Sequence, residues 1–205
     1  MTELLPLFLN LTGRDVVLVG AGRVAAGKLR QLLAVGAHVR VVAPEIADEI
    51  VEIARDPQRT SLQVHRRAFV PDDLDGAWLV VAAATPAVNR DVAEAAEPRH
   101  VFVNAVDDPP NASAFLSGVV RRDGVTLAIS TSGDAPALTA LLREGLDALL
   151  PRDLGAWMAR ARAERIVWRR DGVPMDERKP RLLRALNDLY EATVPWLNAP
   201  EDSWL

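Results

Sequence analysis

The chain has 205 residues, of which 49% are hydrophobic and 25% charged, with a formal net charge of −4. A chain of this length buries enough surface to fold without disulfides, and the absence of cysteine excludes thiol nucleophiles and cysteine metal sites. The acidic balance gives no support for binding nucleic acid or an anionic membrane. No basic n-region precedes the apolar N-terminal stretch and no run is long enough to span a bilayer, so we expect a soluble cytoplasmic protein without a signal peptide.

Short apolar runs alternate with helical patterns over the first hundred residues. Several runs, such as VVLV and WLVVAA, are apolar at every position, which is typical of strands covered on both faces. The sequence therefore predicts an α/β fold, a Rossmann-type doubly wound parallel sheet. The predicted strands are Asp15–Val19, Val39–Ala43, Ser61–His65, Trp78–Ala83 and Val101–Asn104, and the predicted helices are Val24–Val35, Ile46–Asp56 and Ala87–Ala96.

The pattern changes after Asp107–Asn111. Residues 114–130 predict two strands joined at Arg122-Asp123-Gly124, which is a hairpin signal. A helix follows, with Asp134 as its N-cap and Pro151 after its end, and its leucines cover more than one stripe, so we expect burial between two layers or two subunits. Two further helices are predicted near Leu154–Arg170 and Arg178–Thr193. The predicted domains are a Rossmann domain at 1–112, a small α+β dimerisation domain at 113–151 and a helical domain at 152–205.

A glycine-rich turn stands between the first strand and the first helix. Gly20, Gly22 and Ala25 form a GxGxxA pattern, in which Gly20 permits the tight turn and Gly22 lets a pyrophosphate approach the backbone. The helix N-terminus then offers unpaired N–H groups to phosphate oxygens. The alternative is a tight strand-to-helix turn that binds no ligand.

Two further loops are expected beside such a nucleotide. Glu45 follows the second strand, where an acidic residue binds ribose hydroxyls, and no arginine follows there to hold a 2′-phosphate, so NAD is favoured over NADP. Arg40 lies inside that strand and is expected to be structural. After the fourth strand, Ala84, Thr85 and Asn89 are candidates for cofactor contact, with a solvent-facing helix position as the alternative for Asn89.

Polar residues also follow the last parallel strand, at the edge where such sheets bind ligands. Asn104, Asp107 and Asp108 lie there, and a carboxylate at this place could accept a proton during hydride transfer or handle a metal ion. The alternative is turn chemistry, to which Asp-Asp-Pro-Pro is well suited. The three histidines are scattered along the chain without the spacing of a metal site, and no Ser/His/Asp constellation is evident.

Four blocks in order, LPLFLNLTGRDVVLVGAGRVAAGKLRQLL, AWLVVAAAT, NAVDDPPNASAF and LAISTSGDAPALTALLRE, resemble the precorrin-2 dehydrogenase family, the dehydrogenase/ferrochelatase module of siroheme synthase. This resemblance implies NAD-dependent oxidation of precorrin-2 to sirohydrochlorin by a homodimer, and in some members Fe²⁺ insertion as well. It implies that Asp107 is the general base, or the carboxylate that transiently handles the metal. The predicted cofactor contacts are Gly20, Gly22, Arg23, Val24, Pro44, Glu45, Thr85 and Asn104. Of these, the resemblance implies Arg23, Val24, Pro44, Glu45 and Thr85.

The same resemblance implies contacts to a substrate that carries eight carboxylates. Hydroxyl and backbone N–H groups would come from Ser130, Thr131, Ser132 and Gly133, and positive charge from Arg121 and Arg143. Residues 160–184 hold nine basic residues against four acidic ones, for which a solvated helix face is the alternative to substrate binding. A different class of function, an NAD(H)-sensing module without turnover, is also consistent with a nucleotide-binding turn.

Overall fold

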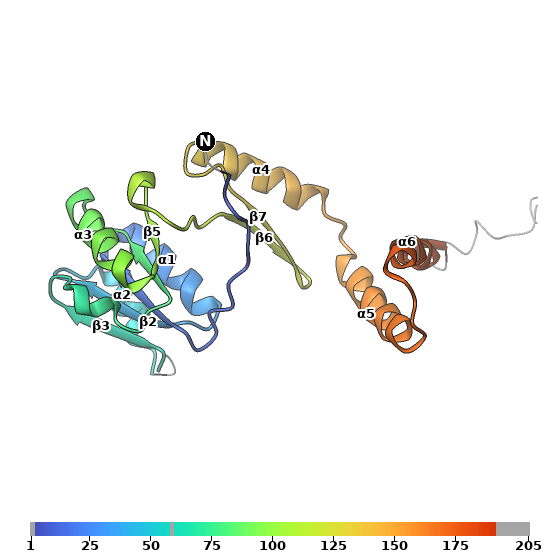
Figure 1. Ribbon diagram of the computed structural model, residues 1–205, viewed down its shortest axis with the longest axis horizontal. Coiled ribbons are helices and arrows are strands. Elements are labelled where there is room, and N and C mark those ends of the chain that lie inside the picture. The colour runs from blue at the N-terminus through green and yellow to red at the C-terminus, as the bar shows by residue number, and fades with distance from the viewer. Residues whose placement is uncertain (1–2, 58–59, 192–205) are drawn as a thin grey trace, which may run out of the picture. The chain divides into compact units, whose positions relative to one another are not determined.

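The computed structural model describes residues 3–57 and 60–191. Its main element is a five-stranded parallel sheet with the order β3-β2-β1-β4-β5 (Figure 1). The strand bounds are Asp15–Val19 for β1, His38–Ala43 for β2, Leu62–Arg66 for β3, Leu79–Ala82 for β4 and Phe102–Ala105 for β5. Each pair is parallel, so all five carboxyl ends meet at one edge. The predicted doubly wound sheet is confirmed, with strand ends shifted by one residue or less.

Helices cover both faces of this sheet. Alternate residues of a strand face opposite sides, so Val16 and Leu18 of β1 join one apolar cluster while Val17 and Val19 join the other. The first cluster holds the buried side chains of α1 (Arg23–Ala34) and α2 (Asp48–Ala54), and the second holds those of α3 (Pro86–Ala96). The continuous apolar runs therefore have the two-sided burial that their composition predicted.

Two compact units divide the described chain. The first contains the parallel sheet and runs to Ser117, and it also includes Ser130–Pro136. The second contains Gly118–Ile129 and the chain from Ala137 onward. The three-domain division at 112 and 151 stays a prediction. The Ser130–Gly133 segment therefore belongs to the unit that contains the sheet, although the residues before and after it in the chain belong to the other unit.

The second unit contains a hairpin and three helices, α4 (Pro136–Leu149), whose first residue is assigned to the first unit, α5 (Leu154–Arg170) and α6 (Met175–Glu191). Strands β6 (Gly118–Arg122) and β7 (Val125–Ile129) are antiparallel, and their two loop residues have positive φ, 49° at Asp123 and 85° at Gly124. This geometry is that of a type I′ hairpin turn and confirms the predicted hairpin.

Some predicted helix ends are wrong. Helix α2 is four residues shorter than Ile46–Asp56, two at each end, and α6 begins three residues before Arg178, while Thr193 lies outside the described residues. Helix α4 begins at Pro136, so Asp134 is not its N-cap. Asp134 instead closes a tight turn, with its N–H donating to the Thr131 carbonyl at 2.9 Å. Among the residues that the structure describes, no helix has the length and apolarity of a membrane span.

Candidate functional site

The glycine turn after β1 is built on a close approach between two backbone segments. Gly20 has a φ of +98°, and a Cβ atom placed on it would lie 2.2 Å from the carbonyl oxygen of Ala83, which follows β4. Its own N–H donates to the Val42 carbonyl at 2.9 Å, so the turn is tied to both strands that neighbour β1. Only glycine fits this position, which confirms the role in the tight turn that the pattern predicts.

Gly22 differs from Gly20 because the space that a side chain would occupy is open. A Cβ atom there would meet no atom within 4 Å, its φ is −81°, and it precedes α1 without a side-chain cap. The N–H groups of Arg23 and Val24 stand in the first turn, where a helix has no carbonyl partners of its own. Both side chains are exposed. Open space in front of unpaired helix amides is what a dinucleotide pyrophosphate needs, so these residues fit NAD.

The loop after β2 is held against the glycine turn. The Ala47 N–H donates to the Ala21 carbonyl at 3.0 Å, so the residues between β2 and α2 lie beside the turn. Pro44 and Glu45 are both exposed there, in agreement with a place next to the ribose. Arg40 faces elsewhere, because its guanidinium donates to the Asp73 carbonyl at 2.9 Å, and its expected structural role is confirmed.

The loop after β4 is stabilised by a hydrogen bond to a buried side chain of α3. Asn89 of α3 is only 2% exposed, and its side-chain oxygen accepts the Ala84 N–H at 3.2 Å. It is therefore not on a solvent-facing position, and its side-chain oxygen already accepts a hydrogen bond from the loop. Thr85 stands just before α3 and is exposed at the same edge of the sheet.

Asn104, near the end of β5, carries the most informative polar group of the sheet edge. The residue is 6% exposed, and its amide nitrogen donates to the Ala114 carbonyl at 3.0 Å. Its side-chain oxygen is buried and accepts no hydrogen bond from any of the residues that the structure describes. A buried acceptor without a donor costs free energy, and such orphans occur where a ligand supplies the missing partner. The Oδ1 atom is thus a candidate acceptor for an N–H or O–H group of a ligand.

The two aspartates after β5 have different surroundings. Asp108 accepts both hydrogen bonds from the Asn111 side-chain amide, at 2.9 and 3.0 Å, and so organises the turn. Asp107 is exposed and has a φ of +55°, a conformation that a non-glycine residue rarely adopts. In the described part of the chain its carboxylate accepts no hydrogen bond and forms no ion pair within 4 Å. Turn chemistry thus accounts for Asp108, and a catalytic role for Asp107 stays a prediction.

The Ser130–Gly133 segment is a tight turn that packs beside this loop. Ser132 and Gly133 have φ values of +55° and +87°, and the Ser132 N–H donates to the Ser130 hydroxyl at 3.1 Å. A Cβ atom on Gly133 would lie 3.2 Å from Pro109 and 3.7 Å from Phe115. The Ser130–Gly133 turn and the loop after β5 that carries Asp107 (the Asp107 loop) are far apart in the sequence. They are nevertheless neighbours within the first unit.

Lys28 is a residue of this site that the sequence analysis did not single out. It is half-buried on α1, burial lowers the pKa of its ammonium, and the negative charge of Asp107 opposes that shift. The sequence contained one signal that could have drawn attention to Lys28, because Lys28 and Lys179 are the only lysines among its 24 basic residues.

The two predicted substrate arginines belong to the second unit. Arg121 is exposed on β6, and Arg143 is exposed on α4 with its guanidinium 3.6 Å from Glu144. Their neighbour Arg122 has a structural role, because it donates to the Asp147 carboxylate at 2.7 Å and to the Leu150 carbonyl at 2.9 Å. The site geometry described above thus lies entirely in the first unit.

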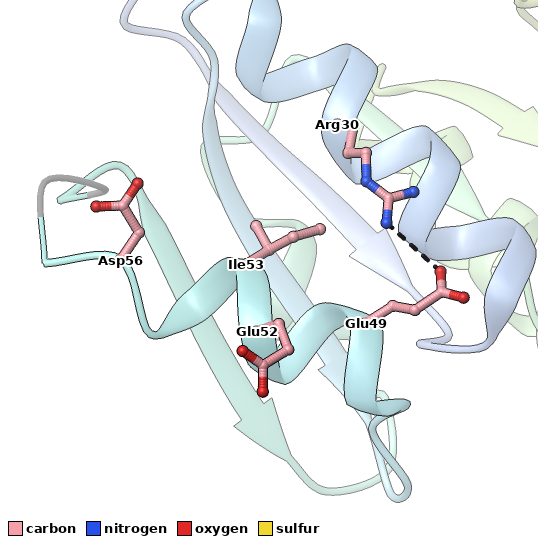
Figure 2. A pocket seen from close by; sticks show the side chains of 5 residues that line it. All are labelled: Arg30, Glu49, Glu52, Ile53 and Asp56. Carbon is pink, nitrogen blue, oxygen red and sulfur yellow. Dashed lines mark ion pairs between the residues drawn. The ribbon is translucent and has the colours of Figure 1, made fainter.

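A pocket on the face covered by α1 and α2 lies away from these residues. It is lined by Arg30, Glu49, Glu52, Ile53 and Asp56, and Figure 2 shows Arg30 directed at Glu49, 3.6 Å away. Three acidic side chains make this place unsuitable for an anionic dinucleotide. Within residues 3–57 and 60–191 no group of three or more His, Asp or Glu side chains could hold a metal ion.

Comparisons with known proteins agree with this geometry. Residues 7–118 match the family model NAD_binding_7, described as NAD(P)-binding. The chain belongs to this family. Siroheme synthase 3 of Aeromonas hydrophila is 43% identical over 155 residues, covering 75% of this chain and 32% of the relative, and siroheme synthase 1 of Yersinia enterocolitica is 42% identical over 154 residues with the same coverage. This member of the NAD(P)-binding family thus spans about a third of the length of those relatives.

One solved structure is similar over nearly the whole chain. The precorrin-2 dehydrogenase SirC superposes with a TM-score of 0.69 at 26% identity, covering 91% of this chain and 92% of that one. The resemblance to the precorrin-2 dehydrogenase family is confirmed. NAD, the expected cofactor, agrees with the family description and with the open helix N-terminus beside Gly22.

Proposed function

We propose that this chain oxidises precorrin-2 to sirohydrochlorin, with NAD⁺ as the hydride acceptor. The observation that carries the proposal is the meeting, at one edge of the sheet, of the glycine turn and the Asp107 loop, with the Ser130–Gly133 turn packed beside that loop. The similarity to SirC, a precorrin-2 dehydrogenase, supports the choice of substrate.

The chain's own groups have distinct tasks in this reaction. The amides of Arg23 and Val24 would hold the pyrophosphate, and Glu45 the ribose hydroxyls, which favours NAD over NADP. The buried Asn104 oxygen would accept an N–H from the nicotinamide carboxamide and so fix the ring at the end of β5. When bound, NAD⁺ takes up a hydride from the substrate.

Asp107 would accept the proton that must leave with that hydride. Oxidation removes two hydrogens from precorrin-2, one as hydride to NAD⁺ and one as a proton, so the products are sirohydrochlorin, NADH and H⁺. A carboxylate that is exposed and bonded to nothing else in the described chain is suited to this task. The hydroxyl and amide groups of Ser130–Gly133 would hold a substrate carboxylate beside it. Substrate binding by Arg121 and Arg143 stays a prediction.

The test is turnover by the purified protein. With precorrin-2 and NAD⁺ we expect NADH formation and the absorption spectrum of sirohydrochlorin. Asp107→Asn should lower kcat by roughly 100-fold or more, because a positioned general base contributes about that much. Asp108→Asn, a matched change one residue away, should retain most of the activity. Binding of NAD⁺ without turnover of active precorrin-2 would support a sensing module instead.

Fe²⁺ insertion into sirohydrochlorin is a separate prediction from the resemblance. The metal would be a substrate, and Asp107 is the carboxylate that would handle it. The paired assay, sirohydrochlorin with and without Fe²⁺ or Co²⁺, decides it independently of the dehydrogenase step.

A homodimer is the second part of the proposal. Helix α4 carries four exposed leucines, Leu138, Leu141, Leu142 and Leu149, with exposed fractions from 42% to 79%. Burial between two layers of the same chain, one of the two expectations, is not what these side chains show. An apolar helix face of this kind favours an interface between subunits.

A further inference from the structure

Helix α5 carries three arginines on one of its sides. Arg162, Arg165 and Arg169 follow one another at intervals of three and four residues, the spacing of neighbours on a helix surface. All three side chains are exposed, and Ile166, which is 72% exposed, lies among them. We call these four residues the arginine stripe, which extends over roughly 10 Å of the helix at a rise of about 1.5 Å per residue.

A different side of α5 packs against α6. Trp168 is only 7% exposed, and the Trp157 indole donates to the Tyr190 hydroxyl of α6 at 2.7 Å. The hairpin turn stands beside the stripe, because a Cβ atom on Gly124 would lie 3.3 Å from the Arg162 guanidinium. The stripe therefore lies on a side of α5 that α6 leaves uncovered, and its first residue adjoins the β6–β7 turn.

The stripe differs from the other arginines of α5 in having no partner. None of its three guanidinium groups forms a hydrogen bond or an ion pair with any residue that the structure describes. The other two arginines of the helix, Arg160 and Arg170, each pair with a carboxylate, at 3.0 and 2.7 Å. The helix dipole favours cations only in the last turn, so it accounts for neither Arg162 nor Arg165.

This arrangement costs stability in the free protein. Like charges three and four residues apart on a helix repel each other and destabilise it. The nearby Asp123 carboxylate lies against Gly155, in the first turn of α5, and forms no ion pair with Arg162. Within the described chain the repulsion is therefore uncompensated, and an anion bound along the stripe would relieve it.

The substrate of the proposed reaction has the matching chemistry, since it is a macrocycle with carboxylates around its edge. A guanidinium holds a carboxylate through two parallel hydrogen bonds, and an exposed aliphatic side chain gains by covering an apolar ring. We propose that the arginine stripe binds the peripheral carboxylates of this tetrapyrrole, with Ile166 in contact with its ring. The identity of the ligand rests on the proposed function, whereas its chemical class, a polycarboxylate, rests on the stripe.

A nucleic acid is the competing polyanion, and the structure disfavours it. The chain has a net charge of −4. Single-stranded nucleic acids are bound largely by stacking on exposed aromatic side chains, and Trp168, the aromatic residue within this part of α5, is buried. A ligand that needs several carboxylate contacts and one apolar contact therefore fits the stripe better.

The first experiment measures binding to the full chain by fluorescence titration with uroporphyrin, which carries eight carboxylates as precorrin-2 does. We expect Arg169→Gln to raise the Kd about 2- to 5-fold and the triple change of Arg162, Arg165 and Arg169 to Gln to raise it roughly 10-fold or more, as for exposed ion pairs. Arg170→Gln removes the same charge one residue away, from a group already paired, and should leave the Kd unchanged.

Two comparisons test the chemistry of the contact. Coproporphyrin, with half the carboxylates, should bind more weakly than uroporphyrin, and added salt should weaken wild-type binding more than binding by the triple variant. An unchanged Kd in the triple variant overturns the proposal. So does binding of a labelled oligonucleotide that the triple change abolishes while uroporphyrin is not bound.

Thermal unfolding separates binding from folding. Because neutral side chains remove the repulsion, the midpoint of the triple variant should be at or above that of the wild type. A lowered midpoint would mean that the arginines support packing and would contradict the proposal.

Failures of the two proposals are distinguishable by kinetics with precorrin-2. The triple variant should raise the KM roughly 10-fold with little change in kcat, the signature of lost binding that is equal in the ground and transition states. Absence of turnover in the wild type refutes the proposed reaction and leaves the uroporphyrin titration to decide the stripe. Wild-type turnover with an unchanged KM in the triple variant refutes only the stripe.

Discussion

Replacing Gly20 by alanine tests the close approach on which the candidate site is built. A Cβ atom at this position would lie 2.2 Å from the Ala83 carbonyl oxygen and 2.7 Å from its carbon, and both are backbone atoms that no side-chain rotation can move away. The φ of +98° adds a conformational cost of about 1–2 kcal/mol for an L-residue. Overpacking of this severity costs about 1–3 kcal/mol more.

The free energy of unfolding should therefore fall by about 2–5 kcal/mol, a large part of the roughly 5–15 kcal/mol that stabilises a typical protein. Urea unfolding followed by circular dichroism measures this fall, and calorimetric titration with NAD⁺ measures binding by the folded fraction. Gly22→Ala is the matched control, because its Cβ would meet no atom within 4 Å at a φ of −81°.

Gly22→Ala should leave stability within about 1 kcal/mol of the wild type, since a lost cap glycine and a gain in backbone rigidity offset each other. Its methyl group should nevertheless weaken NAD⁺ binding at least roughly tenfold, because it occupies the space that the pyrophosphate needs. Wild-type stability of Gly20→Ala, or unchanged NAD⁺ affinity of Gly22→Ala, would refute this account of the two glycines.

Three further predictions concern other parts of the molecule. Asp73 is 4% exposed, and the Arg67 guanidinium, which donates to it at 2.7 Å, lowers the pKa of its carboxyl group. The resulting stability is present at neutral pH and is lost as the pH falls through the folded-state pKa. Asp73→Asn should therefore lose about 2–3 kcal/mol of unfolding free energy at pH 7 and show a flatter acid dependence in urea unfolding. Asn104→Ala should raise the Kd for NAD⁺ roughly tenfold by calorimetry, and an unchanged Kd would mean that the orphaned oxygen meets no cofactor group. Leu141→Glu, on a side chain 65% exposed, should convert a dimer to a monomer in light scattering, and a wild type that is monomeric at micromolar concentration would contradict the proposed interface.

The sheet and its glycine turn could be predicted because local chemistry and tertiary environment agree there. A run such as Val16–Val19 is apolar at every position, and only a strand covered on both faces buries such a run completely. The type I′ hairpin at Asp123-Gly124 could be predicted for a similar reason, since few residues tolerate two successive positive φ angles. In the strand and in the hairpin turn alike, the residue types are compatible with only one local structure.

Helix ends and buried polar residues were harder to predict. The Asp134 cap was predicted wrongly because Asp134 lies in a backbone turn, in which its N–H donates to the Thr131 carbonyl, and the helix begins only at Pro136. Asn89 was predicted as a ligand contact or a surface residue, because an amide in a helix is usually exposed. Its burial depends on the Ala84 N–H, a partner supplied by the loop that precedes α3.

The sequence by itself determined the fold class and the glycine turn, since periodicity and glycine spacing are local properties that survive without coordinates. The family came from a resemblance, which four sequence blocks in a fixed order carried. Only the tertiary structure decided which side chains share the site. Lys28 and Asp107 lie on different elements, α1 and the loop after β5, and only the fold lets the charge of Asp107 act on the half-buried ammonium. The orphaned Asn104 oxygen is likewise a property of packing, because a donor is missing only where burial has excluded water.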